Sequence, residues 1–119
     1  MPHGLTEFQI ASMAALLDRI VPEDDFPSAT QAGCLEFILE FIERDPILSE
    51  VYSAGLMVID QLASPAQFVE LGAQEQDLLV ARIEGTRFGS TVIRQTIEGY
   101  YAGPRSRAAQ EMVGFKVTC

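Results

Sequence analysis

The spacing of its apolar residues constrains this chain most, because they recur every three or four positions behind helix-start signals. Thr6-Glu7-Phe8-Gln9 forms a capping box, and Pro22 ends the segment that follows. Between them lies one apolar helical face, made of Ile10, Met13, Ala14, Leu17, Ile20 and Val21. No alternating run of β-branched residues bounded by turns exceeds four residues. The sequence therefore predicts an all-α protein.

The same signals predict two more long helices. Ser28-Ala29-Thr30-Gln31 repeats the capping-box pattern, and the apolar positions behind it are Cys34, Phe37, Ile38 and Phe41. Asp45-Pro46 combines an N-cap with proline at the first helical position, so a third helix begins directly after the second. Its apolar spacing predicts burial of Leu48, Val51, Val58 and Leu62, with Gly55 at a close helix contact.

Shorter helical segments fill the remainder of the chain. A proline-containing box at Ser64–Gln67 predicts a short helix that Gly72 stops, and a further helix runs from Ala73 to Glu84. Thr86 starts another, which ends at Gly103-Pro104 and buries Val92, Ile93, Ile97 and Tyr100. We predict a last short helix from Ser106 to Val113. We expect one domain over residues 1–119, folded as a single irregular bundle of six or seven helices.

The charge balance excludes two classes of partner. The chain has 17 acidic and 8 basic residues, a net charge of -9, and no stripe of Lys and Arg that could neutralise phosphates. Its longest apolar runs, Met13 to Leu17 and Gly55 to Ile59, fall short of the ~20 residues that a membrane-spanning helix needs. We expect no nucleic-acid partner and no direct membrane insertion.

The residue types that usually carry catalysis are scarce. His3 is the single histidine and lies at the N-terminus, where a catalytic base is hard to position. Cys34 and Cys119 lie far apart without a CxxC motif, and Cys34 sits among apolar neighbours. We therefore interpret Cys34 as a buried packing residue, while a disulfide between the two cysteines stays an open alternative.

Carboxylates and glycines provide no further site motif. Glu36 and Glu40 lie one helical turn apart, which is typical of a solvated face. The acidic loop Glu23-Asp24-Asp25 lacks the pattern of a calcium-binding loop, and Gly99 and Gly103 end a helix where a phosphate cradle would open one. We predict that this chain has no catalytic residue, no metal site and no cofactor site of its own.

The residues from Thr96 to Pro104 crowd two tyrosines, two glycines and a proline at a helix end, with Arg105 and Arg107 directly behind. Tyrosine and arginine are enriched at protein interfaces. The candidate partner surface comprises Tyr100, Tyr101, Arg105, Met112 and Phe115. In the alternative interpretation, Tyr100 fills the core and Tyr101 covers a loop.

Several short segments share the order and spacing of one known family. They are Leu5-Thr6, Ala14 to Pro22, Ala32-Gly33, Tyr52 to Leu56 with Asp60, Glu75 to Leu79, Thr96 to Tyr101 and Gly114-Phe115. From Leu5 to Phe115 the chain thus resembles the gluconate 2-dehydrogenase subunit 3 family. The resemblance implies an accessory subunit that pairs with a large FAD-dependent oxidoreductase of the glucose-methanol-choline type, often alongside a cytochrome c subunit.

The resemblance also implies that the redox chemistry and the FAD belong to the large partner, which the small subunit helps to fold, to accept its flavin or to be exported. Our first hypothesis is therefore a non-catalytic small subunit of a sugar or polyol dehydrogenase. The alternative is a free-standing acidic helical adaptor or regulator that binds an unrelated protein. Because Met1 to Gly4 contain no export signal, we expect a cytoplasmic protein as written, and a periplasmic one if a leader was removed or a partner exports it.

Overall fold

The computed structural model describes residues 4–102, which fold into five α-helices and one 3-10 turn. The elements are α1 (Glu7–Ile20), α2 (Cys34–Arg44), α3 (Pro46–Ala63), η1 (Phe68–Glu70), α4 (Ala73–Ile83) and α5 (Arg87–Ala102). The described residues contain no strand, so the all-α prediction is confirmed for this part of the chain. Within residues 4–102, five of the predicted helical segments form as α-helices and a sixth forms as the 3-10 turn. The helix predicted at 106–113 lies outside the described residues.

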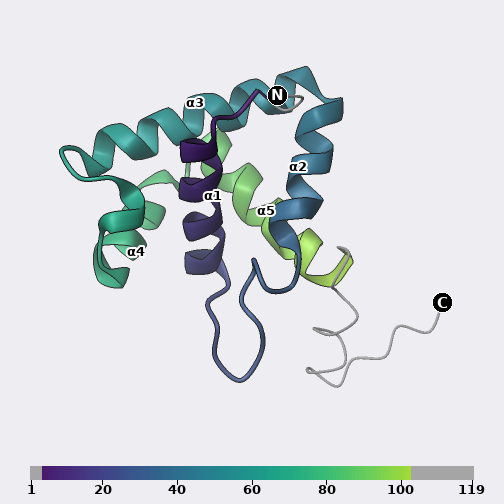
Figure 1. Ribbon diagram of the computed structural model, residues 1–119, viewed down its shortest axis with the longest axis horizontal. Coiled ribbons are helices and arrows are strands. Elements are labelled where there is room, and N and C mark those ends of the chain that lie inside the picture. Colours follow the sequence, from purple (N-terminus) through teal and green to yellow (C-terminus); the bar gives the residue numbers. More distant parts are fainter. Residues whose placement is uncertain (1–3, 103–119) are drawn as a thin grey trace.

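The helices pack around α5. In Figure 1, α3 runs across the top, α1 and α2 extend below it, and α4 lies at the side opposite α2. Helix α5 passes behind α1 and contacts each of the other four helices. Among residues 4–102, no helix combines the length and the apolar composition that crossing a membrane requires.

The core is built from all of these elements. Its largest fully buried apolar side chains are Leu5, Met13, Leu16, Leu17, Ile38, Ile42, Tyr52, Leu56, Ile59, Phe68 and Val92. Burying one such side chain stabilises the fold by roughly 1.5–3 kcal/mol. Tyr52 brings a polar atom into this core, and its hydroxyl donates a hydrogen bond of 2.6 Å to Oε1 of Gln95 on α5.

Three helix starts follow the sequence prediction because their signals are local. The Thr6 hydroxyl accepts from the Gln9 amide at 3.0 Å, and the Gln9 side chain accepts from the Thr6 amide at 3.1 Å. The Asp45 carboxylate accepts from the first amides of α3, and the Thr86 hydroxyl accepts from the Gly89 amide at the start of α5. Each cap of this kind contributes ~1 kcal/mol to helix stability.

The second helix begins later than predicted. Ser28–Gln31 makes the hydrogen bonds of a capping box, but its backbone forms turns, and α2 begins only at Cys34. Two features redirect the chain. The Asp18 carboxylate on α1 accepts from the amide and the hydroxyl of Thr30, both at 2.8 Å, and Gly33 adopts the left-handed region with a φ of 92°.

The prediction of a short helix that begins with Ser64–Gln67 is also wrong in position and length. Here the cap is Gln67, whose amide donates to the Glu70 carboxylate at 2.8 Å and whose side chain accepts from the Glu70 amide. Because Gly72 already caps α4, the intervening space holds only the 3-10 turn Phe68–Glu70.

The buried face of α3 differs from the predicted one. The residues of α3 that are buried are Tyr52, Gly55, Leu56, Ile59 and Ala63, while Leu48, Val51 and Leu62 are half-buried and Val58 is 44% exposed. Phe41 and Ile97, which belong to the predicted apolar faces of their helices, likewise lie on the surface instead of in the core. Apolar residues surround more than one face of these helices, so spacing alone does not select the inner face. The predicted close contact at Gly55 is confirmed, since the Phe88 ring packs directly against it.

Candidate interaction surface

The predicted partner surface begins at the end of α5, where two adjacent tyrosines differ in exposure. Tyr100 is buried, and its hydroxyl donates a hydrogen bond of 2.7 Å to the Pro27 carbonyl. Tyr101 is 46% exposed, and its ring meets that of Tyr100 edge to face with centroids 5.3 Å apart. Arg105, Met112 and Phe115 lie outside the described residues. Within the described part, Tyr101 is therefore the member of this candidate set that presents exposed aromatic surface.

A groove along α3 was not predicted from the sequence. Its floor follows the outer face of this helix, where Ile47, Val51, Ala54 and Val58 succeed one another, and its volume is about 420 Å³. Ile83 at the end of α4 and Phe88 at the start of α5 form the opposite wall. We call this hollow the α3 groove. Its exposed apolar side chains include Ile47, at 63%, and Val58.

Two glycines allow close packing around the α3 groove, one between α3 and α5 and the other between α5 and the end of α4. Gly55 on α3 leaves room for the Phe88 ring, which also packs edge to face on Tyr52 with centroids 5.6 Å apart. Gly89 lies against the Ile83 carbonyl, where a Cβ atom would overlap the backbone. The turn between α4 and α5 therefore sits directly beside α3.

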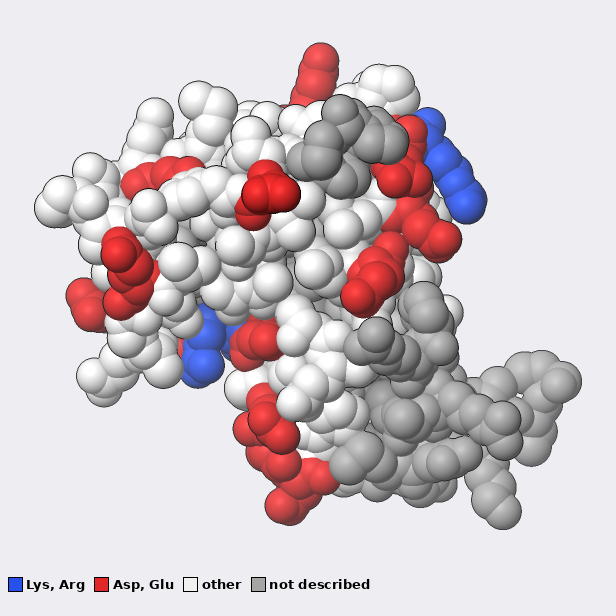
Figure 2. All heavy atoms as spheres, in the orientation of Figure 1, with Lys and Arg blue, Asp and Glu red and all other residues white. Residues whose placement is uncertain are grey.

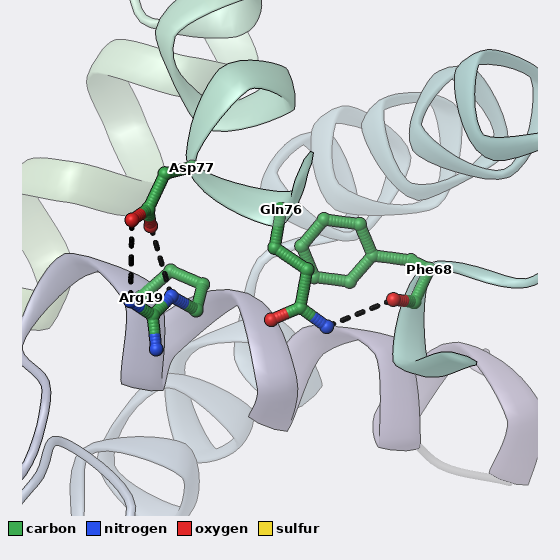
Figure 3. Close-up of polar contacts among 4 residues, drawn as sticks. All are labelled: Arg19, Phe68, Gln76 and Asp77. Carbon is green, nitrogen blue, oxygen red and sulfur yellow. Dashed lines mark hydrogen bonds and ion pairs between the residues drawn. The ribbon is translucent and has the colours of Figure 1, made fainter. Parts of the chain in front are cut away.

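Two polar contacts hold α4 against α1 and η1, as Figure 3 shows. The Arg19 guanidinium on α1 makes a bidentate pair with the Asp77 carboxylate on α4, at 2.9 and 3.2 Å. This pairing lowers the pKa of Asp77. The side-chain amide of the buried Gln76 donates a hydrogen bond of 2.8 Å to the Phe68 carbonyl. The partners of the ion pair lie 58 positions apart, so no local sequence signal points to it.

Helix α4 also lines a second hollow of about 620 Å³ against the end of α3. Its lining includes Leu62 and Ala63 from α3 and Leu78 and Leu79 from α4, and Leu78 is 66% exposed. Both hollows are open and predominantly aliphatic. This chemistry suits the apolar side chains of another protein.

The described residues contain neither a cluster of metal-ligating side chains nor the strand–turn–helix motif typical of dinucleotide binding. Residues 4–102 contain no group of three or more His, Cys, Asp or Glu that could hold a metal ion. Dinucleotide pyrophosphates bind at glycine-rich turns between a strand and a helix, and this part of the chain has no strand. The lining of each hollow includes a single arginine. It is Arg87 in the α3 groove and Arg82 in the second hollow.

Cys34 is a packing residue, as predicted. Its side chain is fully buried and its thiol donates to the Thr96 carbonyl at 3.2 Å. Burial disfavours the thiolate and raises the pKa of Cys34 to about 12. Cys34 is free in the structure, and Cys119 lies outside the described residues.

We expect the Cys34 thiol of a Cys119→Ser variant to resist alkylation at pH 8. A pKa of about 12 against about 9 in the unfolded chain lowers the thiolate fraction by roughly a thousandfold. The raised pKa also makes the free energy of unfolding fall as pH rises from 9 towards 12, because the unfolded state releases this proton first. Iodoacetamide labelling with and without urea measures the difference. Equal labelling rates in the two conditions would contradict the buried thiol.

This architecture defines a small all-α domain whose surface carries apolar grooves suited to contact with another protein. The chain belongs to the gluconate 2-dehydrogenase subunit 3 family, whose model matches residues 7–116. No curated protein and no solved structure matches it. The family resemblance is thus confirmed, and membership implies a small subunit that associates with the other subunits of a gluconate 2-dehydrogenase complex.

Proposed function

We propose that this chain is a non-catalytic small subunit that binds and stabilises a large FAD-dependent sugar or polyol dehydrogenase subunit and assists its flavin loading or maturation. The family match over residues 7–116 carries this proposal. Two open apolar hollows support it, the α3 groove and the hollow between α4 and the end of α3, because exposed apolar surface of this kind marks protein contacts.

The proposed role needs no chemistry from this chain. A subunit that binds only the folded form of its partner stabilises that form by mass action, by ~2.7 kcal/mol at a concentration of 100 times Kd. A folded apo-partner held in this way keeps its flavin site available for loading. The FAD and the residues that oxidise the substrate belong to the large subunit, and a cytochrome c subunit accepts the electrons.

Co-expression tests the proposal. We expect the large subunit of the host to be recovered in soluble, flavin-loaded and active form with this chain, and largely as an insoluble or flavin-poor protein without it. The measurements are soluble yield, flavin absorbance per large subunit and dehydrogenase activity after removal of the small subunit's gene.

A control expresses the Gly89→Ala variant, which we expect to be strongly destabilised because a Cβ there would overlap the Ile83 carbonyl. This variant should lower the soluble yield and the flavin content of the large subunit towards the values of the deletion. A large subunit that is equally soluble, flavin-loaded and active without any small subunit would overturn the proposed function.

A further inference from the structure

Helix α3 is apolar on two faces, but the described part of the chain covers only one of them fully. The inner face buries Tyr52, Leu56 and Ile59 completely. The outer face carries Ile47, at 63% exposure, and Val58, at 44%. An apolar helix face is normally packed against another element. The outer face is thus apolar surface for which the described residues provide no complete cover.

The α3 groove is long enough to accommodate one helix of about three turns. From Ile47 to Val58 its floor runs for about 16 Å along α3, which corresponds to about three helical turns. The opposite wall, Ile83 and Phe88, gives the hollow two apolar sides. An amphipathic helix binds such a groove through side chains at i, i+4 and i+7.

Charge at the rim specifies the polar flanks of the occupant. Glu50 lies on the α3 side of the groove and Arg87 at the start of α5, so the rim carries both signs. A helix that fits would direct a Lys or Arg towards Glu50 and a carboxylate towards Arg87. A rim of mixed sign also fixes the direction in which the helix lies.

The net charge of the domain disfavours a second copy as the occupant. Of the chain's 17 acidic and 8 basic residues, Glu111, Arg105, Arg107 and Lys116 lie outside the described residues, which leaves 16 acidic against 5 basic. Figure 2 shows acidic side chains spread over the visible face, with few basic ones among them. Two such domains repel each other, whereas a partner segment rich in Lys and Arg is attracted.

The place where the described chain ends also favours an occupant from outside. The groove meets the start of α5, whereas the chain continues from Ala102 at the other end of this helix. A helix of 16 residues separates these points by about 22 Å. A segment made of residues 103–119 would need about seven residues to span this distance, which leaves about ten of its 17 for a groove floor three helical turns long.

We propose that the α3 groove binds an amphipathic helix of the large flavin-dependent subunit. This helix presents aliphatic side chains at i, i+4 and i+7 to Ile47, Val51 and Val58, with a basic residue at Glu50 and an acidic one at Arg87. The proposal rests on the proposed function, since it assigns the surface through which the small subunit holds its partner.

A matched pair of substitutions tests this assignment. Val58→Glu introduces a charge on the groove floor, and Val69→Glu makes the same change on η1, where Val69 is 41% exposed and outside the groove lining. We expect Val58→Glu to raise the Kd for the purified large subunit by at least about thirtyfold, the loss typical of an interface hot spot. Val69→Glu should leave the Kd within about threefold of wild type.

Circular dichroism melting tests whether both variants are folded, and Ile47→Glu, at another exposed floor residue, provides a second variant if Val58→Glu is not. Binding by Val58→Glu and Ile47→Glu as tight as by Val69→Glu would overturn the groove assignment and leave the proposed function intact. Absence of binding by the wild-type chain would overturn both.

A photo-crosslinking residue at Val58 identifies the occupant within the assembled complex. We expect the crosslink to join Val58 to a large-subunit peptide with helical apolar spacing and a Lys or Arg beside it. A crosslink to residues 103–119 of this chain, or to a second copy of it, would overturn the proposal in favour of that occupant. Crosslinking that reaches no protein in a complex shown to be intact would also overturn it.

Discussion

A Gly89→Ala variant is expected to lose at least about 3 kcal/mol of folding free energy, the upper part of the range for overpacking. A Cβ atom at this position would overlap the carbonyl oxygen and carbon of Ile83 and the Cα of Glu84. All of these are backbone atoms, so no side-chain rotation relieves the overlap. Relief requires α5 to move away from the end of α4, which opens the core around Phe88 and Ile83.

Gly85 provides the control for this prediction. A Cβ atom there meets no atom within 4 Å, and the backbone at Gly85 is not left-handed. Gly85→Ala should therefore change the stability by less than about 1 kcal/mol, with stabilisation as the favoured sign because the unfolded chain loses freedom. Urea unfolding followed by circular dichroism compares the variants. Similar midpoints for Gly89→Ala and Gly85→Ala would show that the α4–α5 turn is not tightly packed.

The sequence predicts helix starts well where one side chain bonds to a backbone amide three residues away. Thr6, Asp45 and Thr86 each cap the helix whose start the sequence predicts at that residue. The prediction fails at Ser28–Gln31, although the local hydrogen bonds form there as well. Asp18 lies on another helix, and its bonds to Thr30 are tertiary contacts that no local pattern contains.

The candidate surface depends even more on tertiary contacts. The end of α5 could be singled out from its composition, but the Pro27 carbonyl that accepts from the Tyr100 hydroxyl lies 73 positions away and has no local signal. The α3 groove was missed because α3 has two apolar faces and spacing cannot rank them. The packing of Phe88 on Gly55 selects the inner face and leaves Val58 on the surface.

Because Phe88 packs on Gly55, we expect the effect of Gly55→Ala on stability to change sign when Phe88 is replaced by alanine. Alanine is favoured over glycine within a helix by about 1 kcal/mol. In the native protein, however, a Cβ at Gly55 would overlap the Phe88 ring beginning at its Cγ atom, which lies close to the backbone of α5 and cannot swing far. We therefore expect Gly55→Ala to destabilise the domain by about 2 kcal/mol.

In a Phe88→Ala background the same Gly55→Ala change should stabilise the domain by about 1 kcal/mol, because the overlap is gone and the helix preference remains. Phe88→Ala alone should cost about 3–5 kcal/mol through the cavity it leaves beside Tyr52. The two sites are thus expected to couple by about 3 kcal/mol in a double-mutant cycle measured by urea unfolding. Additive effects would mean that Phe88 does not pack on Gly55, and the α3 groove would then lack the wall that gives it its shape.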